Sequence, residues 1–237
     1  KKKPKITFLS TGNEIVNYKS KRVLPWQVRN SNNYYFKSFG ENLNFNIIDG
    51  GIIKDSNPKK LIKILKKLKN SDTDIIVTSG AISAGKFDFI PELINKFSFK
   101  KCFKGVAIKP GRPIMLSKFK KNNKLFFGLP GNPISCAATF RFFVYPLIRK
   151  SLGMKVENKF TAKLNNKYLK VKNFTHFVRC TIKADKKGSI QLKVLQDQQS
   201  NKIKSFVKAN CWGIFPEGKR KFKKGDIIEW VPLIPGS

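Results

Sequence analysis

The sequence has few of the residues on which common catalytic and metal sites are built. It contains one histidine and four cysteines in 237 residues. The cysteines, at positions 102, 136, 180 and 211, form no Cys-x-x-Cys pair, which argues against a zinc site, a redox motif or a secreted disulfide framework. We therefore expect a reducing, cytoplasmic compartment. The histidine, His176, stands in a strand-like run, and the chain offers no well-placed partner for a Ser/His/Asp triad.

Long apolar runs are also missing. Only residues 6–9 follow the basic N-terminus as an apolar stretch, which is too short for a signal peptide. No run approaches the length of a membrane span, so no membrane association is expected. The chain opens with Lys1-Lys2-Lys3 and no methionine, which is consistent with a fragment of a longer protein.

Acidic residues are scarce. The chain has 14 Asp and Glu against 49 Lys and Arg, and its formal net charge is +35. Such a charge suits nucleic acid, an anionic membrane surface or anionic small molecules. Arginine, which grips phosphates and bases with two hydrogen bonds, supplies only seven of the basic residues. Because the lysines are spread over the whole length, we favour a solvated lysine surface over a nucleic-acid footprint.

The first two-thirds of the chain alternate strand-like and helix-like segments. This alternation predicts an α/β fold, with a parallel or mostly parallel sheet flanked by helices. In such sheets ligands bind beyond the carboxyl ends of the strands. The predicted strands cover residues 6–10, 45–53, 74–78, 102–108 and 124–127, and the predicted helices cover residues 31–42, 58–68, 87–97 and 136–150.

After about residue 153 the pattern changes to short strand-like runs separated by turns. This spacing predicts a small all-β domain, a barrel or a sandwich. We therefore predict two domains, an α/β domain over residues 1–153 and an all-β, barrel-like domain over residues 154–237. The predicted strands of the second domain cover residues 160–164, 175–183, 189–195, 206–215 and 226–231.

The most informative segment is Gly128-Leu129-Pro130-Gly131-Asn132-Pro133-Ile134-Ser135, which connects an apolar strand to a helix. Glycine lets the backbone approach a ligand closely, Asn132 suits a helix N-cap, and Pro133 suits the first helical turn. Free N–H groups and the helix dipole both favour an anion at such a place. The segment predicts a cradle for a phosphate or oxyanion, although a rigid connection without a ligand would use the same residues.

Three carboxylates follow predicted strands. Glu14 comes after Thr11-Gly12, Asp55 follows residues 52–53, and Asp88 follows the loop at residues 79–85. In a parallel sheet all three project at the carboxyl-end rim, where a few carboxylates suit Mg²⁺. Alternatively, Asp55 and Asp88 cap the helices that follow them and Glu14 is solvated. For the three together we favour the metal site.

The segment from Lys109 to Pro113 adds the opposite charge. Its two prolines and glycine favour a rigid turn. Lys109 and Arg112 would therefore lose little backbone conformational entropy when a ligand binds. A fixed pair of cations suits a phosphate or tetrahedral oxyanion, and the hydroxyl groups of Ser83 and Ser135 are candidate donors to it. Lys109 could equally be one more surface lysine.

Together these motifs resemble the molybdopterin molybdotransferase family of molybdenum cofactor biosynthesis, which includes the gephyrin E domain. The resemblance extends over nearly the whole chain, and several motifs in the right order make it specific. The matching residues are 11–14, 53–55, 79–85 with Asp88, 107–113, 128–135, 177–179, 198–200 and 209–210.

The resemblance implies an enzyme that places molybdate on adenylylated molybdopterin and releases AMP with the help of Mg²⁺. Glu14, Asp55 and Asp88 would then bind the metal or the adenylate. It also implies a homodimer and a molybdopterin adenylyltransferase as partner. The pterin phosphate or molybdate would bind Ser83, Lys109, Ser135 and the loop Gly128, Leu129, Pro130, Gly131 and Asn132, and the molybdate pocket would include Arg112, Pro113, Arg179 and Ser200.

The sequence departs from the family in several places. Asn13 replaces a frequent Asp, Ala81 a glycine, Arg112 a lysine, and Gly105 a lysine of some members. Members also carry two further domains before the matched segment. The alternatives are a molybdopterin adenylyltransferase, whose single α/β domain resembles residues 5–152, and a non-catalytic scaffold or cationic nucleic-acid binder.

Overall fold

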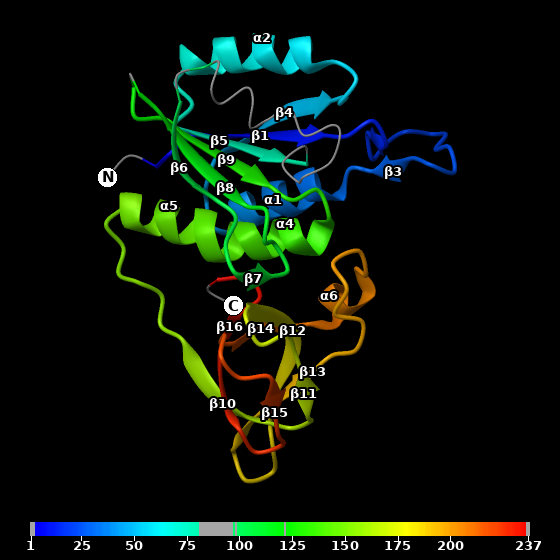
Figure 1. Ribbon diagram of the computed structural model, residues 1–237, viewed down its shortest axis with the longest axis vertical. Coiled ribbons are helices and arrows are strands. Elements are labelled where there is room, and N and C mark those ends of the chain that lie inside the picture. Colours follow the sequence, from blue (N-terminus) through cyan, green and yellow to red (C-terminus); the bar gives the residue numbers. More distant parts are fainter. Residues whose placement is uncertain (1–2, 81–96, 98, 121, 236–237) are drawn as a thin grey trace. The chain divides into compact units, whose positions relative to one another are not determined.

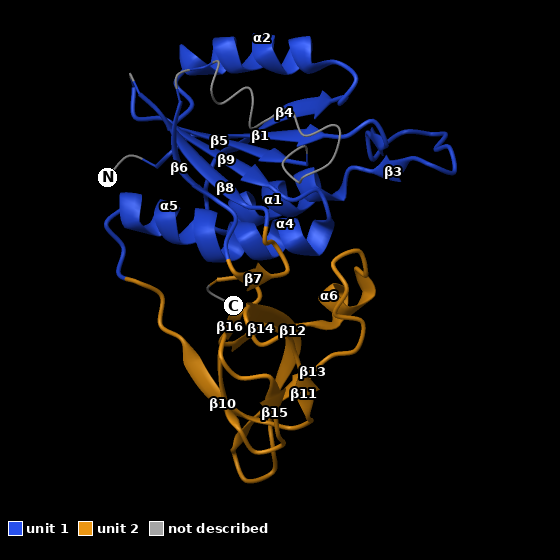
Figure 2. Ribbon diagram, viewed as in Figure 1, with its two compact units in different colours: residues 1–106, 113–155 blue, residues 107–112, 156–237 orange. Residues whose placement is uncertain are grey.

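The computed structural model describes residues 3–80, 97, 99–120 and 122–235. The chain divides into two compact units (Figure 2). Unit 1 contains residues 1–106 and 113–155, and unit 2 contains residues 107–112 and 156–237. The division into domains at residue 153 stays a prediction; the compact units differ from it by including residues 107–112 with the C-terminal part of the chain.

Unit 1 is built on a six-stranded mixed sheet, in the order β4-β1-β5-β9-β8-β6. The pairings from β4 to β9 are parallel, and those of β8 with β9 and β6 are antiparallel. The α/β class with a mostly parallel sheet is therefore confirmed, but the antiparallel β8 was not predicted. The strands are β1 (Ile6–Thr11), β4 (Ile47–Ile53), β5 (Ile75–Ser79), β6 (Phe99–Lys104), β8 (Met115–Phe119) and β9 (Leu125–Leu129), with a small pair β2 (Ile15–Val16) and β3 (Val28–Arg29) outside the sheet.

The helices of unit 1 begin where the sequence places capping residues. The side chain of Asn30 accepts a hydrogen bond at the start of α1 (Ser31–Asn42), and that of Asn57 does so before α2 (Pro58–Lys69). The predicted helix over residues 136–150 is α4 (Pro133–Thr139), a π-helical turn η1 (Phe140–Val144) and α5 (Tyr145–Ser151). The predicted helix over residues 87–97 lies almost wholly outside the described residues.

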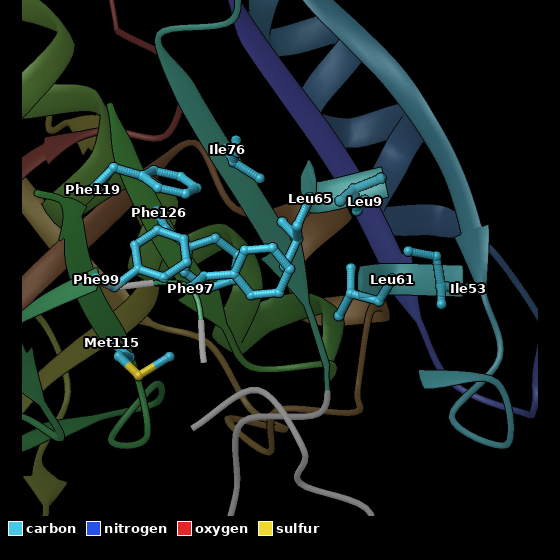
Figure 3. Close-up of a cluster of buried hydrophobic side chains, with 10 residues drawn as sticks. All are labelled: Leu9, Ile53, Leu61, Leu65, Ile76, Phe97, Phe99, Met115, Phe119 and Phe126. Carbon is cyan, nitrogen blue, oxygen red and sulfur yellow. The ribbon is translucent and has the colours of Figure 1, made fainter. Parts of the chain in front are cut away.

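The helices cover both faces of the sheet, with α2 on one face and α1, α4 and α5 on the other (Figure 1). Successive residues of a strand point to opposite faces of the sheet, so Phe8 and Leu9 pack against helices on opposite faces. Leu9 belongs to the cluster in Figure 3, together with Leu61 and Leu65 of α2. On the other face the ring of Phe36 lies 4.4 Å from that of Phe8 and 4.5 Å from that of Phe140. These buried side chains hold the strand ends in place.

Unit 2 is a five-stranded barrel with one added strand. Its sheet runs β13-β10-β16-β14-β12-β7, and the further pairing of β13 with β12 closes it. The predicted strand over residues 206–215 is wrong at its start, because residues 206–208 belong to a short helix and the strand begins at Cys211. The elements are β7 (Ile108–Lys109), β10 (Phe160–Leu164), β11 (Tyr168–Leu169), β12 (Thr175–Ala184), β13 (Ile190–Val194), α6 (Lys204–Lys208), β14 (Cys211–Phe215), β15 (Lys221–Phe222) and β16 (Ile227–Pro232).

Strand β7 explains why residues 107–112 belong to unit 2. It pairs in parallel with the start of β12, so that Ile108 lies opposite Thr175 and Lys109 opposite His176. The backbone N–H of Thr175 also donates to the carbonyl of Ala107 at 3.0 Å. Lys109 is therefore fixed by the sheet of unit 2, next to the histidine.

A search of the described residues for membrane spans finds no helix with the length and apolar character to cross a bilayer.

Candidate functional site

Unit 1 contains a cavity of about 530 Å³ at the carboxyl ends of β1, β5 and β9. This is the place where open α/β sheets bind ligands. Its walls come from the ends of these strands, the loop after β4, the start of α1 and the start of α4. The lining residues are Ser10, Thr11, Gly12, Glu14, Ile15, Val28, Arg29, Asn30, Ser31, Asn32, Asp55, Ser79, Gly80, Pro113, Pro130, Gly131, Asn132, Pro133 and Ser135.

The floor of the cavity is backbone at close approach. Gly80 has φ of 97°, in the left-handed region that favours glycine. A Cβ on Gly80 would lie 2.6 Å from both the carbonyl oxygen and Oγ1 of Thr11. The N–H of Gly80 donates to the Leu129 carbonyl at 2.9 Å, which ties the ends of β5 and β9 together. A Cβ on Gly131 would lie 3.5 Å from the Cα of Gly80. The glycines thus leave room for a ligand where side chains would fill the space.

Glu14 and Asp55 bring two carboxylates to this cavity. The Glu14 carboxylate folds over Gly12, where a Cβ would lie 2.8 Å from Oε2. The loop that carries Glu14 is held by Lys54, whose Nζ donates to the carbonyls of Asn13 at 2.7 Å and Ile15 at 2.5 Å. Asp55 follows Lys54 directly, so one short segment braces the first carboxylate and supplies the second.

The alternative that Asp55 caps the next helix is wrong. The N-cap of α2 is Asn57, whose Oδ1 accepts from the N–H of Lys60 at 3.1 Å. The side chain of Asn13, where relatives of this pattern often have aspartate, accepts from both the N–H and Oγ of Ser56 at 3.1 Å. Asparagine therefore retains the oxygen acceptor that ties the two carboxylate-bearing loops together.

Two asparagines that the sequence analysis missed shape the opposite wall. Asn30 Oδ1 accepts from Ser10 Oγ at 3.1 Å and from the N–H of Asn33 at 3.3 Å. Asn32 is buried, and its Nδ2 donates to the Gly131 carbonyl at 2.9 Å. The signal in the sequence is a pair of asparagines at a helix start, which capping alone would explain. The Asn30 side chain caps α1 and also holds Ser10 of β1, and the Asn32 side chain holds the glycine loop before α4.

The start of α4 forms the anion-facing side of the cavity. Asn132 occupies the N-cap position with Pro133 after it, as predicted, but the Asn132 side chain makes no capping hydrogen bond. The first helical bond joins the N–H of Cys136 to the Asn132 carbonyl at 2.9 Å. Earlier N–H groups of a first turn are outside the helical ladder and suit an anion. Ser135 is buried here and lines the cavity.

This cavity carries two acidic side chains although the chain as a whole is strongly basic. Its lining includes the carboxylates of Glu14 and Asp55 and one cation, Arg29. The Arg29 guanidinium donates to the carbonyls of Tyr18 and Ser20, at 2.5 and 2.7 Å, so it is engaged by the backbone of the same loop. Within the described residues no group of three or more His, Cys, Asp or Glu is placed to hold a metal ion. Two carboxylates nevertheless fit Mg²⁺, which completes its shell with water and phosphate oxygens.

The other predicted site residues fall into three groups. Lys109, Arg112, Arg179 and Ser200 belong to unit 2 and are described within it. Gly128 is buried inside β9 and does not line the cavity. The two remaining predicted residues, Ser83 and Asp88, lie outside the described residues.

Within unit 2, Arg179 is a buried brace. It is 1% exposed, and its Nη2 donates to the carbonyls of Asp197 at 2.6 Å and Gln199 at 3.2 Å. Burial lowers the pKa of the guanidinium to about 10, so it remains charged at neutral pH. Gln198 returns two bonds to the same strand, since Oε1 accepts from the N–H of Arg179 and Nε2 donates to its carbonyl. The turn before Ser200 is thereby fixed to β12.

Lys109 and Arg112 are both exposed on unit 2. Lys109 lines a second cavity, of about 640 Å³, that belongs to this unit. The Arg112 guanidinium lies 5.8 Å from the ring centroid of Phe174, a cation–π distance. The two cations predicted from the sequence to bind an oxyanion, Lys109 and Arg112, are thus carried by the β-barrel unit.

Comparison with known proteins identifies the family. A profile described as "Probable molybdopterin binding domain" matches residues 7–150, well over half of the chain. The chain belongs to this molybdopterin-binding domain family. A second profile, "MoeA C-terminal region (domain IV)", matches residues 161–233. The two matches correspond to the α/β and β-barrel parts, except that the first also spans residues 107–112 of unit 2.

Individual relatives of the chain agree with the family. It is 31% identical over 232 residues to a molybdopterin molybdenumtransferase from Haemophilus influenzae, covering 97% of this chain and 56% of the relative. It is 28% identical over 230 residues to the enzyme of the same name from Bacillus subtilis, covering 96% and 52%. The chain therefore spans about half the length of the curated relatives that it matches.

A solved structure gives the same result. The molybdopterin biosynthesis MoeA protein from Pyrococcus horikoshii superposes with a TM-score of 0.81 at 28% identity, covering 99% of this chain and 55% of that protein. The α/β fold followed by a barrel-like part is therefore one that MoeA structures share. Molybdenum cofactor biosynthesis is the setting that these relatives indicate.

Proposed function

We propose that this chain takes part in molybdopterin molybdotransferase catalysis, in which molybdate is inserted into adenylylated molybdopterin with Mg²⁺-dependent release of AMP. The observation that carries the proposal is the unit 1 cavity, where Glu14 and Asp55 meet a glycine-lined floor and the start of α4. The curated relatives, named molybdopterin molybdenumtransferase, support it.

The donor set of the cavity fits the proposed metal. Mg²⁺ prefers one or two carboxylates together with water and phosphate oxygens, and it would neutralise phosphate charge beside Glu14 and Asp55. Asp88 is proposed as a third acid of the same site. In a chain of net charge +35, two carboxylates with one engaged arginine make a local environment that favours a cation.

The remaining walls are proposed to hold the substrate. The N–H groups at the start of α4, with the Ser135 hydroxyl, would donate to a phosphate. Pro130, Gly131 and Asn132 form the loop against which it would lie, and the bond from Asn32 to the Gly131 carbonyl keeps that loop in position. In the reaction, water attacks one phosphorus of the phosphoanhydride between adenylate and pterin phosphate, the bridging P–O bond breaks, and AMP and the pterin phosphate are released as separate molecules. Ser83 and Pro113 are proposed as further substrate contacts.

The oxyanion substrate, molybdate, is proposed to bind the cations of unit 2. Lys109 is exposed and fixed by β7, and Arg112 follows it in the same segment. Ser200 would donate a hydroxyl hydrogen bond. Arg179 is proposed to position the turn before Ser200, because its Nη2 already donates to the carbonyls of Asp197 and Gln199.

Release of AMP tests the proposal. The full-length protein is incubated with adenylylated molybdopterin, molybdate and Mg²⁺, and AMP is measured over time. Asp55→Asn is expected to lower the rate by about 100-fold, because an isosteric amide no longer supplies the charge that offsets the cation. The matched control is Asp49→Asn, an exposed carboxylate on β4 that should leave the rate within about twofold. No AMP from the wild type, or equal rates for Asp55→Asn and the wild type, would overturn the proposal.

The same assay separates the rivals. A molybdopterin adenylyltransferase would consume ATP and form the adenylylated pterin, whereas a scaffold or nucleic-acid binder would release no AMP. The match of residues 161–233 to the MoeA C-terminal region favours the molybdotransferase. A homodimer, an adenylyltransferase partner and a cytoplasmic location complete the proposal.

A further inference from the structure

The cavity of unit 2 is strongly cationic. It measures about 640 Å³, and its lining includes Lys109, Lys170, Lys172 and Arg220. The lining that the described residues provide contains no Asp or Glu. Four cations around one hollow repel one another, and an anion relieves that repulsion. The charge therefore predicts an anionic occupant.

His176 supplies a second, independent indication of a ligand. It lines this cavity, is 5% exposed, and is the only histidine of the sequence. Its Nδ1 lies 3.1 Å from the hydroxyl of Tyr168. Its Nε2 is buried and has no hydrogen-bond partner among the residues that the structure describes. An unsatisfied buried polar group costs about 1–3 kcal/mol, which a ligand atom can recover.

The protonation of this pair leaves two tautomers of His176, in which Nε2 is either a donor or an acceptor. Burial, with the charges of Lys170 and Lys109, lowers the pKa of His176 to about 4, so the imidazole is neutral at pH 7. Burial raises the pKa of Tyr168 to about 12, so its hydroxyl keeps its proton. An anion bound among these cations would select the tautomer in which that hydroxyl donates to Nδ1 and Nε2 carries the hydrogen. An anionic oxygen is the matching acceptor.

The rest of the lining is mixed, with Gln198 and Gln199 as polar members and an apolar side formed by Leu169, Val171 and Phe177. Leu169 and Val171 are 59% and 49% exposed, and Phe177 lies beside them in the lining. Lys170, between the two aliphatic residues, is buried and donates to the carbonyls of Val171 at 3.1 Å and Phe174 at 2.7 Å. The volume is in the range of sites for small organic molecules, about 300–1,000 Å³. A bare oxyanion would leave most of this space and its apolar surface unused.

We propose that the cavity of unit 2 binds the phosphomonoester of a small organic molecule. The phosphate accepts from Nε2 of His176 and pairs with Lys172, Arg220 and Lys109, and the organic part packs on Leu169. The site goes beyond the proposed transferase reaction and shares only Lys109 with the residues assigned there. Lys170 acts by holding the 170–174 turn through its two backbone bonds.

His176 itself reports on the site. The Cε1–Hε1 signal of His176, assigned by its absence in His176→Gln, is followed by NMR in the full-length protein at pH 7.5, during titration with phenyl phosphate and, separately, with inorganic phosphate. Phenyl phosphate is expected to shift the signal saturably. Inorganic phosphate should need about tenfold more ligand, because the apolar contact is missing. Equal affinity for the two probes would overturn the organic part of the proposal, and no saturable shift with either would overturn the site.

Two exposed variants avoid disturbing the barrel core. Lys172→Gln and Arg220→Gln are each expected to weaken phenyl phosphate binding by about tenfold, the effect of losing one charged hydrogen bond. Lys221→Gln removes the exposed cation next to Arg220 that does not line the cavity, and should change binding by less than about twofold. Equal weakening by all three would show non-specific attraction and contradict the proposal. Asp55→Asn should leave this binding unchanged, so the test is separate from that of the transferase.

Discussion

The two cavities of this protein are built from opposite chemistry. The unit 1 cavity has two carboxylates, Glu14 and Asp55, above a floor of glycine backbone. The unit 2 cavity has four cations and a buried neutral histidine. Both belong to a chain of net charge +35, so the total charge describes neither of them. Where the acids gather is more informative about function than how many bases the surface carries.

The cavities also differ in what holds them. In unit 1 the lining comes mainly from loops after parallel strands, joined by bonds such as that from Asn32 to the Gly131 carbonyl. In unit 2 a strand inserted from the middle of the chain, β7, pairs with β12 and fixes Lys109 beside His176. Substitutions in loops and in the barrel should therefore have separable effects.

The largest expected effect comes from closing the floor of the unit 1 cavity. In Gly80→Ala the new Cβ would meet the Thr11 carbonyl and Oγ1 at 2.6 Å, at a φ of 97°. We expect the free energy of unfolding to fall by about 3 kcal/mol. Urea denaturation measures the change, and phenyl phosphate binding by unit 2 should persist below the transition.

Gly51→Ala provides the matched control for this prediction. Gly51 also has a positive φ, of 88°, but a Cβ there would meet nothing within 4 Å. Only the backbone strain remains, so a loss of about 1 kcal/mol is expected. Equal losses in the two variants would show that the close approach of Thr11 and Gly80 is not what constrains the site.

The next effect concerns the buried histidine of unit 2. The folded-state pKa of about 4 lies below the ordinary value of 6.5, so the unfolded chain takes up a proton first as the pH falls. Stability is therefore lost between pH 6.5 and 4, by up to about 3 kcal/mol from this group. His176→Gln should lose that much less stability than the wild type over this range, by urea denaturation. Parallel curves for the two proteins would contradict the burial of a neutral imidazole.

The smallest effect is on the loop that carries Glu14. Lys54→Met removes the two bonds from Nζ to the carbonyls of Asn13 and Ile15. We expect a loss of about 1 kcal/mol in stability and a rise of about tenfold in the Mg²⁺ concentration needed for half-maximal AMP release. Lys60→Met, an exposed lysine of α2, is the control. An unchanged Mg²⁺ requirement would show that Lys54 does not position the carboxylate.

The sequence predicted the elements best where local signals were strong. The helices predicted over residues 31–42 and 58–68 are α1 and α2, and the strand predicted over residues 160–164 is β10. The antiparallel β8 was missed because its pairing with β9 and β6 depends on contacts between strands, which the sequence of residues 115–119 alone does not indicate. The predicted strand at residues 206–215 was wrong at residues 206–208, which belong to α6, since apolar runs this short do not separate helix from strand.

The candidate site shows the same limit. The sequence placed Glu14, Asp55 and the loop before α4 after strands of a parallel sheet, whose ends lie at a common edge. The structure shows all three in the lining of one cavity. Asn30 and Asn32 were missed, since a capping residue and a wall of a site use the same side chain. The brace formed by Arg179 could not be seen in the sequence either, because its acceptors are backbone carbonyls of a distant turn.

Binding of Mn²⁺ in place of Mg²⁺ tests the central claim most directly. Free Mn²⁺ is measured by electron paramagnetic resonance with the full-length protein and AMP. We predict one site that Mg²⁺ displaces, weakened about tenfold or more in both Glu14→Gln and Asp55→Asn and unchanged in Asp49→Asn. Equal Mn²⁺ affinity in all four proteins would contradict a metal held by the carboxylates of the unit 1 cavity.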